Sequence, residues 1–402
     1  MAFRKPPFKR EPSIPENAGE HLALQKLDND TKTAAAGMSL PEARFLVKFY
    51  YDTQRFRIHI SNQIKAIHKP YNDWMKLCER LKKEIEDCNI NLEFLKTPIE
   101  QMNIEELKKV LFGENDKKHK DEILDIYVDR DKVEKLIADK VAELSEKLDK
   151  ATEELAEKEP NPPKVENHET LDYFLQHYKK MENNIAICLE KFIENQPIYQ
   201  YWLKYVVGIG PIITAGLIAH INIKKANTAG AIERFGGIDP TVHWNKKEKR
   251  PWNAELKTLF WKIGQSFIKT SGRPNDFYGK IYLERKKKEM ERNESGKYKE
   301  LAQEIARTKE FKTDAGKKMK KIYESGKLPQ SHILSRAARY ATKIFVSHLF
   351  SVWYELDRGE KPPKPFAIAQ LGHVHEIKVP YWDEDWEEQW DVMQIAKQNQ
   401  DE

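Results

Sequence analysis

Apolar residues recur every three or four positions along most of this chain, which is the spacing of one face of an α-helix. One broad apolar stripe runs between residues 40 and 67 among Arg and Lys, and another runs from 167 to 194. Short β-branched segments that alternate with polar residues and end at turns are scarce. The pattern predicts a mainly α-helical protein.

Capping residues and turn residues place the ends of several expected helices. The sequence Ser39-Leu-Pro-Glu42 is a capping box, which predicts a helix over 40–67. Further helices are expected over 71–87, 103–112 and 252–269, and Thr228 can cap another helix that ends at Phe235. The helix over 252–269 is expected to place five residues in the core: Leu256, Leu259, Phe260, Ile263 and Phe267. Residues 1–38 are polar, rich in Pro and Ala and without periodicity, so we expect them to form a flexible tail.

The segment 133–155 carries a heptad pattern, with apolar residues at Ile137, Val141, Leu144, Leu148, Ala151 and Leu155. This spacing is typical of a coiled coil, whose partner helix lies in the same chain or in a second subunit. We expect a homo-oligomer through these heptads, and an ordinary amphipathic helix is the alternative. Prolines after Glu159 break the helix, so 133–155 and 167–194 are expected to pair as antiparallel arms of a stalk over 39–198.

The segment VVGIGPIITAGLIAHI, residues 206–221, has the pattern of a helix-hairpin-helix. Pro211 suits the first position of a helix, and glycine allows the backbone to approach a ligand closely. Free N–H groups at a helix start match a phosphate oxygen. The candidate contacts here are Lys204, Gly208, Ile209, Gly210 and Ile212, and the alternative is a tight turn that only packs two helices.

Charge adds a second candidate region. The net charge of +5 and the pI near 8.7 are compatible with a polyanionic partner, and basic clusters lie in the second half of the chain. Cations alternate with an aromatic side chain at Trp244, Lys246, Lys247, Lys249 and Arg250, a combination that neutralises phosphates and stacks on bases. The alternative is a solvated loop whose tryptophans fold into the core.

The residues GIGPIITAGLIAHI and ERFGGIDP resemble the C-terminal domain of the IS one-ten / one-sixteen / nine-oh-two family of insertion-sequence transposases. The resemblance covers about 40–360 loosely and is specific over 202–265. It implies a helix-hairpin-helix domain over 199–360, preceded by a coiled-coil linker and interrupted by a charged insertion over 285–328. We expect that insertion to be a solvated charged helix or hairpin.

Two departures from this family affect the expected activity. The family's RNase-H-like nuclease domain has no counterpart before Ser39, and the position of its serine nucleophile falls at Asn245-Lys246. An amide cannot attack a phosphodiester. Thr241 and Ser266 are nearby hydroxyls without the family's motif around them.

Several histidines and tryptophans are weaker candidates. His373 and His375 suggest a metal site but lack a third ligand, so no metal or cofactor is expected. His220 and His348 lie on apolar helices and are expected in the core. Residues 361–402 are expected to be a strand-like and acidic tail, in which Trp382, Trp386 and Trp390 suggest a helix that docks by its aromatic edge. The alternative is an acidic flap that competes with nucleic acid for the basic surface.

These observations predict a cytoplasmic nucleic-acid-binding protein, with DNA and structured RNA as partners, no membrane partner and no cleavage activity. Three cysteines without C-x-x-C spacing fit a reducing compartment. One alternative is a recombinase that uses a hydroxyl such as Thr241, with a nuclease supplied in trans. The other is a helical scaffold for protein partners.

Overall fold

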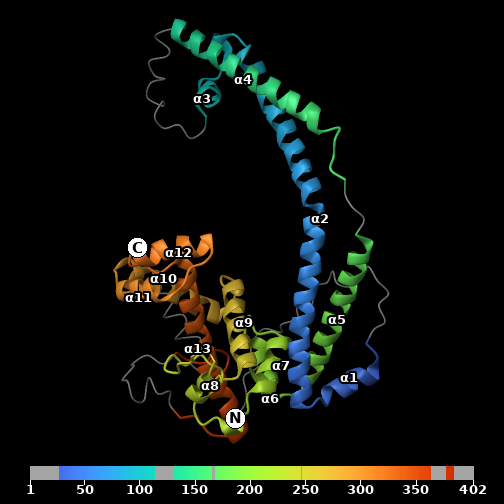
Figure 1. Cartoon of the computed structure of the whole chain (residues 1–402), viewed down its shortest axis with the longest axis vertical. Coiled ribbons are helices and arrows are strands. Elements are labelled where there is room, and N and C mark those ends of the chain that lie inside the picture. The colour runs from blue at the N-terminus through green and yellow to red at the C-terminus, as the bar shows by residue number, and fades with distance from the viewer. Residues whose placement is uncertain (1–26, 114–129, 165–167, 246, 364–376, 384–402) are drawn as a thin grey trace. The chain divides into compact units, whose positions relative to one another are not determined.

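The computed structural model describes residues 27–113, 130–164, 168–245, 247–363 and 377–383, and these form α-helices joined by turns and short 3-10 segments (Figure 1). No strand occurs in these ranges, so the mainly α prediction is confirmed. The chain divides into two compact units, Phe56–His177 and the remainder. Among the described helices, none combines the length and apolarity that a bilayer span requires.

Helix α1 (Asn29–Ala36) lies inside the segment expected to be a flexible tail, and this corrects that expectation for residues 29–38. The Asp28 carboxylate accepts from the Thr31 N–H at 2.7 Å and caps the helix. Ala35 and Met38 are buried in the main core, and their burial holds the helix in place. Residues 1–26 of the expected tail lie outside the described part of the chain.

Helix α2 (Leu40–Leu95) begins at the predicted capping box, with Ser39 and Glu42 exchanging two 3.4 Å hydrogen bonds. The expected break between 67 and 71 is wrong, because the helix continues through Pro70. A proline removes one backbone hydrogen bond, but the helix need not end where both flanks are held by tertiary contacts. Here His68 contacts His168, and the Trp74 indole donates to the Lys158 carbonyl at 2.7 Å.

Helix α4 (Arg130–Lys158) carries the heptads and packs on α2 in the second unit, together with α3 (Ile104–Phe112). Leu144 is buried beside Cys88 and Leu92, and Lys147 pairs with Glu84 at 3.3 Å. The pairing is antiparallel. The apolar heptad face therefore packs on a helix of the same chain. The heptads no longer support the expected homo-oligomer.

Helix α5 (Glu169–Glu194) also packs against α2. In the second unit, the imidazoles of His68 and His168 meet through their Nε2 atoms, and His168 Nδ1 lies 2.5 Å from Asp172. In the first unit, Gln54 donates to Glu182 at 3.1 Å. The expected pairing of 133–155 with 167–194 is therefore wrong: both segments use α2 as their partner.

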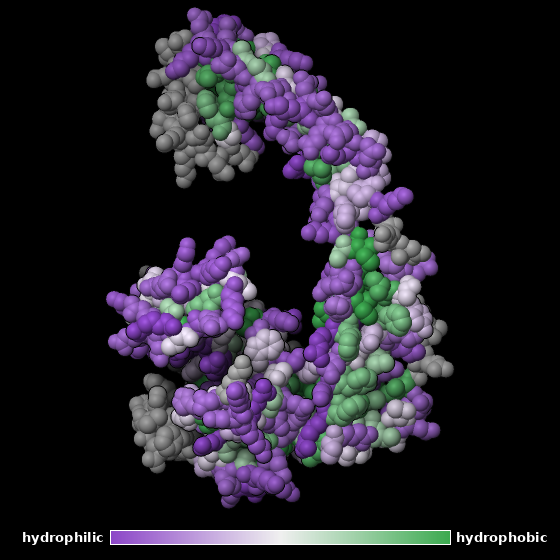
Figure 2. Space-filling model, viewed as in Figure 1, coloured by the Kyte–Doolittle hydropathy of each residue, from purple (hydrophilic) through white to green (hydrophobic). Residues whose placement is uncertain are grey.

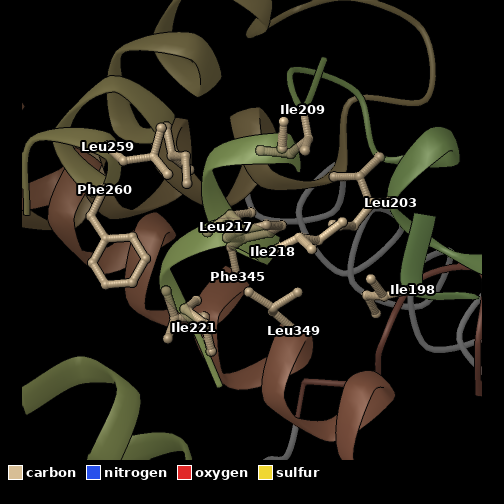
Figure 3. Close-up of a cluster of buried hydrophobic side chains, with 14 of the residues drawn as sticks. Ile198, Leu203, Ile209, Leu217, Ile218, Ile221, Leu259, Phe260, Phe345 and Leu349 are labelled. Carbon is tan, nitrogen blue, oxygen red and sulfur yellow. The ribbon is translucent and has the colours of Figure 1, made fainter. Parts of the chain in front are cut away.

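The first unit is built around α7 (Pro211–His220), with α9 (Ala254–Thr270) and α13 (Gln330–Arg358) packed against it. Figure 3 shows Leu217 and Ile218 of α7 among Phe345 and Leu349 of α13 and Leu203. Because α7 is apolar on all sides, it is stable only when enclosed in this way. The predicted core residues of α9 are confirmed as buried: Leu256, Leu259, Phe260, Ile263 and Phe267.

The charged insertion is more than a solvated helix or hairpin, which corrects that expectation. It contains the end of α10 (Phe277–Glu294), with α11 (Lys299–Thr308) and α12 (Asp314–Glu324), and a small core of its own that includes Tyr298, Ala302 and Tyr323. In Figure 2 these helices present mostly hydrophilic residues to the viewer. Glu289 is nevertheless fully buried, bonded to Arg336 at 2.6 Å and to the Tyr298 hydroxyl at 2.7 Å.

His220 and His348 are buried, as predicted. The Tyr278 hydroxyl lies 2.8 Å from His348 Nδ1, and His348 Nε2 lies 3.0 Å from the Ile377 carbonyl. The segment 377–383 thus docks on α13, where the Trp382 indole donates to Glu355 at 3.0 Å. Trp386 and Trp390 lie outside the described residues.

Substituting Glu289 should destabilise the fold, because it leaves Arg336 and Arg285 without their buried carboxylate. Burial raises the Glu289 pKa, but the bonds from Arg336 and Tyr298 outweigh it and lower the pKa overall. We expect Glu289→Ala to reduce the free energy of unfolding by about 3 kcal/mol in urea denaturation. The matched control is Glu310→Gln, which removes an exposed carboxylate paired with Lys312 and should have little effect. Equal effects of both changes would contradict this account.

Stability should fall as the pH drops from about 6.5 to 4, because burial lowers the pKa of His348 to about 4. The unfolded chain then binds a proton that the folded chain excludes, at a cost approaching about 3 kcal/mol at the lower pH. Thermal unfolding over this range measures the loss. His348→Gln should flatten the slope, whereas substituting the exposed His59 should leave it unchanged.

Candidate nucleic-acid interface

The hairpin loop (residues 206–210) joins a short helical segment to α7. Helix α6 (Pro197–Tyr201) and a 3-10 turn (Leu203–Tyr205) lead into it, and the buried Trp202 anchors this approach. The Ile209 N–H donates to the Val206 carbonyl at 3.1 Å, and the Ile209 side chain is buried. Ile209 therefore holds the bend, and its N–H is not available to a ligand. Helix α7 starts at Pro211, as predicted.

Gly208 is half-buried and faces α9. Its φ is +93°, and an added Cβ would lie 3.2 Å from both Phe267 and the Thr270 hydroxyl. The Ser266 hydroxyl also donates to the Gly208 carbonyl at 2.6 Å. The absence of a side chain at 208 therefore allows a close approach to α9, whereas the sequence suggested an approach to a ligand.

Gly210 is on the open side of the same loop. It is exposed, and an added Cβ would meet nothing within 4 Å. Among the described residues, no acceptor is bonded to the N–H groups of Gly210, Ile212 and Ile213. Free N–H groups at a helix start carry partial positive charge and favour anions. This end of α7 is thus open to an anion.

Two lysines on α9 flank the Ser266 contact. Lys262 lies one turn before Ser266 and Lys269 nearly one turn after it, so all three share one side of the helix. The Lys262 ammonium lies 3.5 Å from the centre of the Tyr51 ring. Burial, followed by repulsion from Lys269 and Arg55, lowers the Lys262 pKa. Neither lysine has an acidic partner in the described ranges, and neither was identified from the sequence.

Lys204, a predicted contact, precedes the hairpin loop. Its ammonium lies 4.9 Å from the centre of the Tyr205 ring, and its side chain is half-buried. Lys204 therefore lies in the turn that leads into the loop, and it forms no ion pair with a described residue.

The predicted aromatic and basic loop forms a folded turn in which the tryptophans are only half-buried. The Trp244 indole donates to the Glu248 carbonyl at 2.8 Å, and Trp244 meets Trp252 edge-on at 6.2 Å between ring centres. The Arg250 guanidinium lies 5.4 Å from the Trp244 ring centre. Lys247 and Lys249 are exposed, and Lys246 lies outside the described residues.

Tertiary structure adds two cations to this loop that the sequence did not suggest. The Lys257 ammonium lies 3.7 Å from the centre of the Trp252 ring. Burial, followed by repulsion from Arg339 and Arg250, lowers the Lys257 pKa. The sequence could have suggested Lys257, because it lies only five residues after Trp252 in the first turns of α9. Arg339 could not be found in this way, since only the packing of α13 brings it near Lys257.

The two candidate nucleophiles are held in structural hydrogen bonds. The Thr241 hydroxyl donates to Asp239 at 2.7 Å, and the Thr241 backbone N–H and hydroxyl lower the Asp239 pKa. A carboxylate with a lowered pKa is a weak general base. The Ser266 hydroxyl is engaged by Gly208. No group of three potential metal ligands occurs among the described residues, and His373 and His375 lie outside them.

Comparison of the chain with family models, with curated proteins and with solved structures finds no match.

The two glycines should respond differently to the same substitution. Gly208→Ala places a Cβ in a left-handed backbone and against α9, so we expect a loss of about 1–3 kcal/mol in the free energy of unfolding. Gly210→Ala has an ordinary φ of −91° and open space, so stability should change little. Chemical denaturation of both variants measures the difference, and a stable Gly208→Ala variant would contradict the packing described here.

Proposed function

We propose that this protein binds nucleic acid through the phosphate backbone, using the open start of α7 and the lysines of α9. Two observations carry the proposal, both made on the described residues. The N–H groups of Gly210, Ile212 and Ile213 have no acceptor there, and the Ser266 contact with the same loop is flanked on α9 by two lysines without acidic partners. Backbone amides and lysines position a phosphate without reading a base. The proposed binding is therefore independent of sequence, with DNA and structured RNA as partners.

The geometry favours binding over strand cleavage. Both candidate hydroxyls donate to acceptors of the fold, and Asp239 has a lowered pKa. The proposed role therefore requires no reaction at Thr241 or Ser266. A role in binding without cleavage also agrees with the expectation drawn from the sequence beside the resemblance to the transposases.

The affinity of this site should depend on salt and on both its parts. Lys262→Gln combined with Lys269→Gln removes two phosphate contacts, so the slope of log K against log salt should become shallower by about 1.8 on duplex DNA. Gly210→Ala should weaken binding about tenfold at one salt concentration, because its methyl group obstructs charge-assisted hydrogen bonds. Fluorescence anisotropy with duplex DNA and with structured RNA measures both effects.

The matched control is Lys224→Gln combined with Lys225→Gln. These two exposed lysines follow the opposite end of α7, and their substitution removes the same charge. The control should leave the salt slope close to that of the wild type. If it reduces the slope as much as the α9 pair, binding is a property of net charge and the proposed site is wrong.

A further inference from the structure

Helix α9 exposes one large aromatic side chain to solvent. Trp261 is 63% exposed, whereas Phe260 and Phe267 of the same helix are buried in the core. Exposure of a single apolar residue is common. Trp261 differs from an ordinary exposed apolar residue because cationic side chains lie on both sides of it.

Helix geometry places Trp261 between two sets of cations. At 100° per residue, Lys257 lies about 40° from Trp261 around the helix, and Lys262 lies about 100° to the other side. Lys262 and Lys269 belong to the side that contacts the hairpin loop through Ser266. The exposed face of α9 therefore has a cationic edge on each side of the indole.

The edge at Lys257 is a concentration of positive charge. Arg250 and Arg339 both repel Lys257 and thereby contribute to its lowered pKa, after burial. No acidic side chain pairs with any of the three in the described part of the chain. Three uncompensated cations stabilise a polyanion, and they disfavour a basic or purely apolar partner.

We propose that Trp261 stacks an unpaired base, so that the preferred partner is a single-stranded segment lying across α9 with its phosphates on the two cationic edges. This rests on the proposed function and specifies its substrate. Stacking needs an open base face, which single strands provide and a duplex interior does not. Cations on both sides of an exposed aromatic ring match a strand that crosses the helix, because the phosphates before and after the stacked base then lie on the two edges.

The test compares a labelled oligothymidylate strand, a strand of equal length in which the bases are replaced by abasic sites, and a duplex of equal length. Trp261→Ala should weaken binding of the oligothymidylate about 5- to 150-fold, since stacking on one base is worth roughly 1–3 kcal/mol. Trp261→Phe should retain most of the affinity. For the duplex and the abasic strand, Trp261→Ala should equal the wild type.

Phe45→Ala is the matched control, because Phe45 is an aromatic residue with the same 63% exposure on α2. It should leave all three affinities unchanged. The stacking proposal is overturned if Trp261→Ala binds oligothymidylate as the wild type does, or if the abasic strand binds the wild type as tightly as the strand with bases. It is also overturned if Trp261→Ala changes only the self-association of the protein.

The two proposals fail in different ways. If wild-type protein binds none of the three probes, the proposed function itself is wrong. If the probes bind with the dependence on Lys262 and Lys269 described above but without dependence on Trp261, only the stacking of an unpaired base is wrong.

Discussion

The contact between Gly208 and α9 is the constraint on which the candidate interface depends. The Ser266 hydroxyl holds the Gly208 carbonyl, and the missing side chain at Gly208 lets the loop reach Phe267 and Thr270. This contact holds the bend, and α7 begins directly after it at Pro211, with N–H groups at its start that no described residue accepts. A side chain at 208 would push the loop away from the side of α9 on which Lys262, Ser266 and Lys269 lie.

The two glycines of the loop consequently have different physical roles. Gly208 adopts a left-handed backbone and meets α9, so its requirement is one of packing. Gly210 has an ordinary backbone conformation and open space around it. Only Gly210 is available for close approach by a ligand. Identical residues two positions apart thus serve the fold and the proposed site, respectively.

Helix α9 connects the packing of the first unit to its surface charge. Its buried residues contact α7 and α13, while its other side has lysines along two edges and the exposed Trp261 between them. Packing of α13 brings Arg339 towards Lys257, and among the described residues no carboxylate pairs with either of them. The unbalanced charge is a property of the assembled helices, since the chain as a whole has nearly equal numbers of acidic and basic residues.

The sequence by itself determined the helical class, several helix starts and the core face of α9, because these depend on local capping and on a spacing of three to four residues. Ser39, Thr228 and Pro211 marked helix starts that the structure confirms. It also identified the bend at 208–210. Tertiary structure decided the rest: that the heptads of α4 pair with α2, that α2 continues through Pro70, and that Ser266 is a hydrogen-bond donor to the loop. The same reason explains why the structure was needed to identify Lys257, Lys262 and Arg339. Residues far apart in sequence share a surface only after the helices have packed, and periodicity carries no information about which helix faces which.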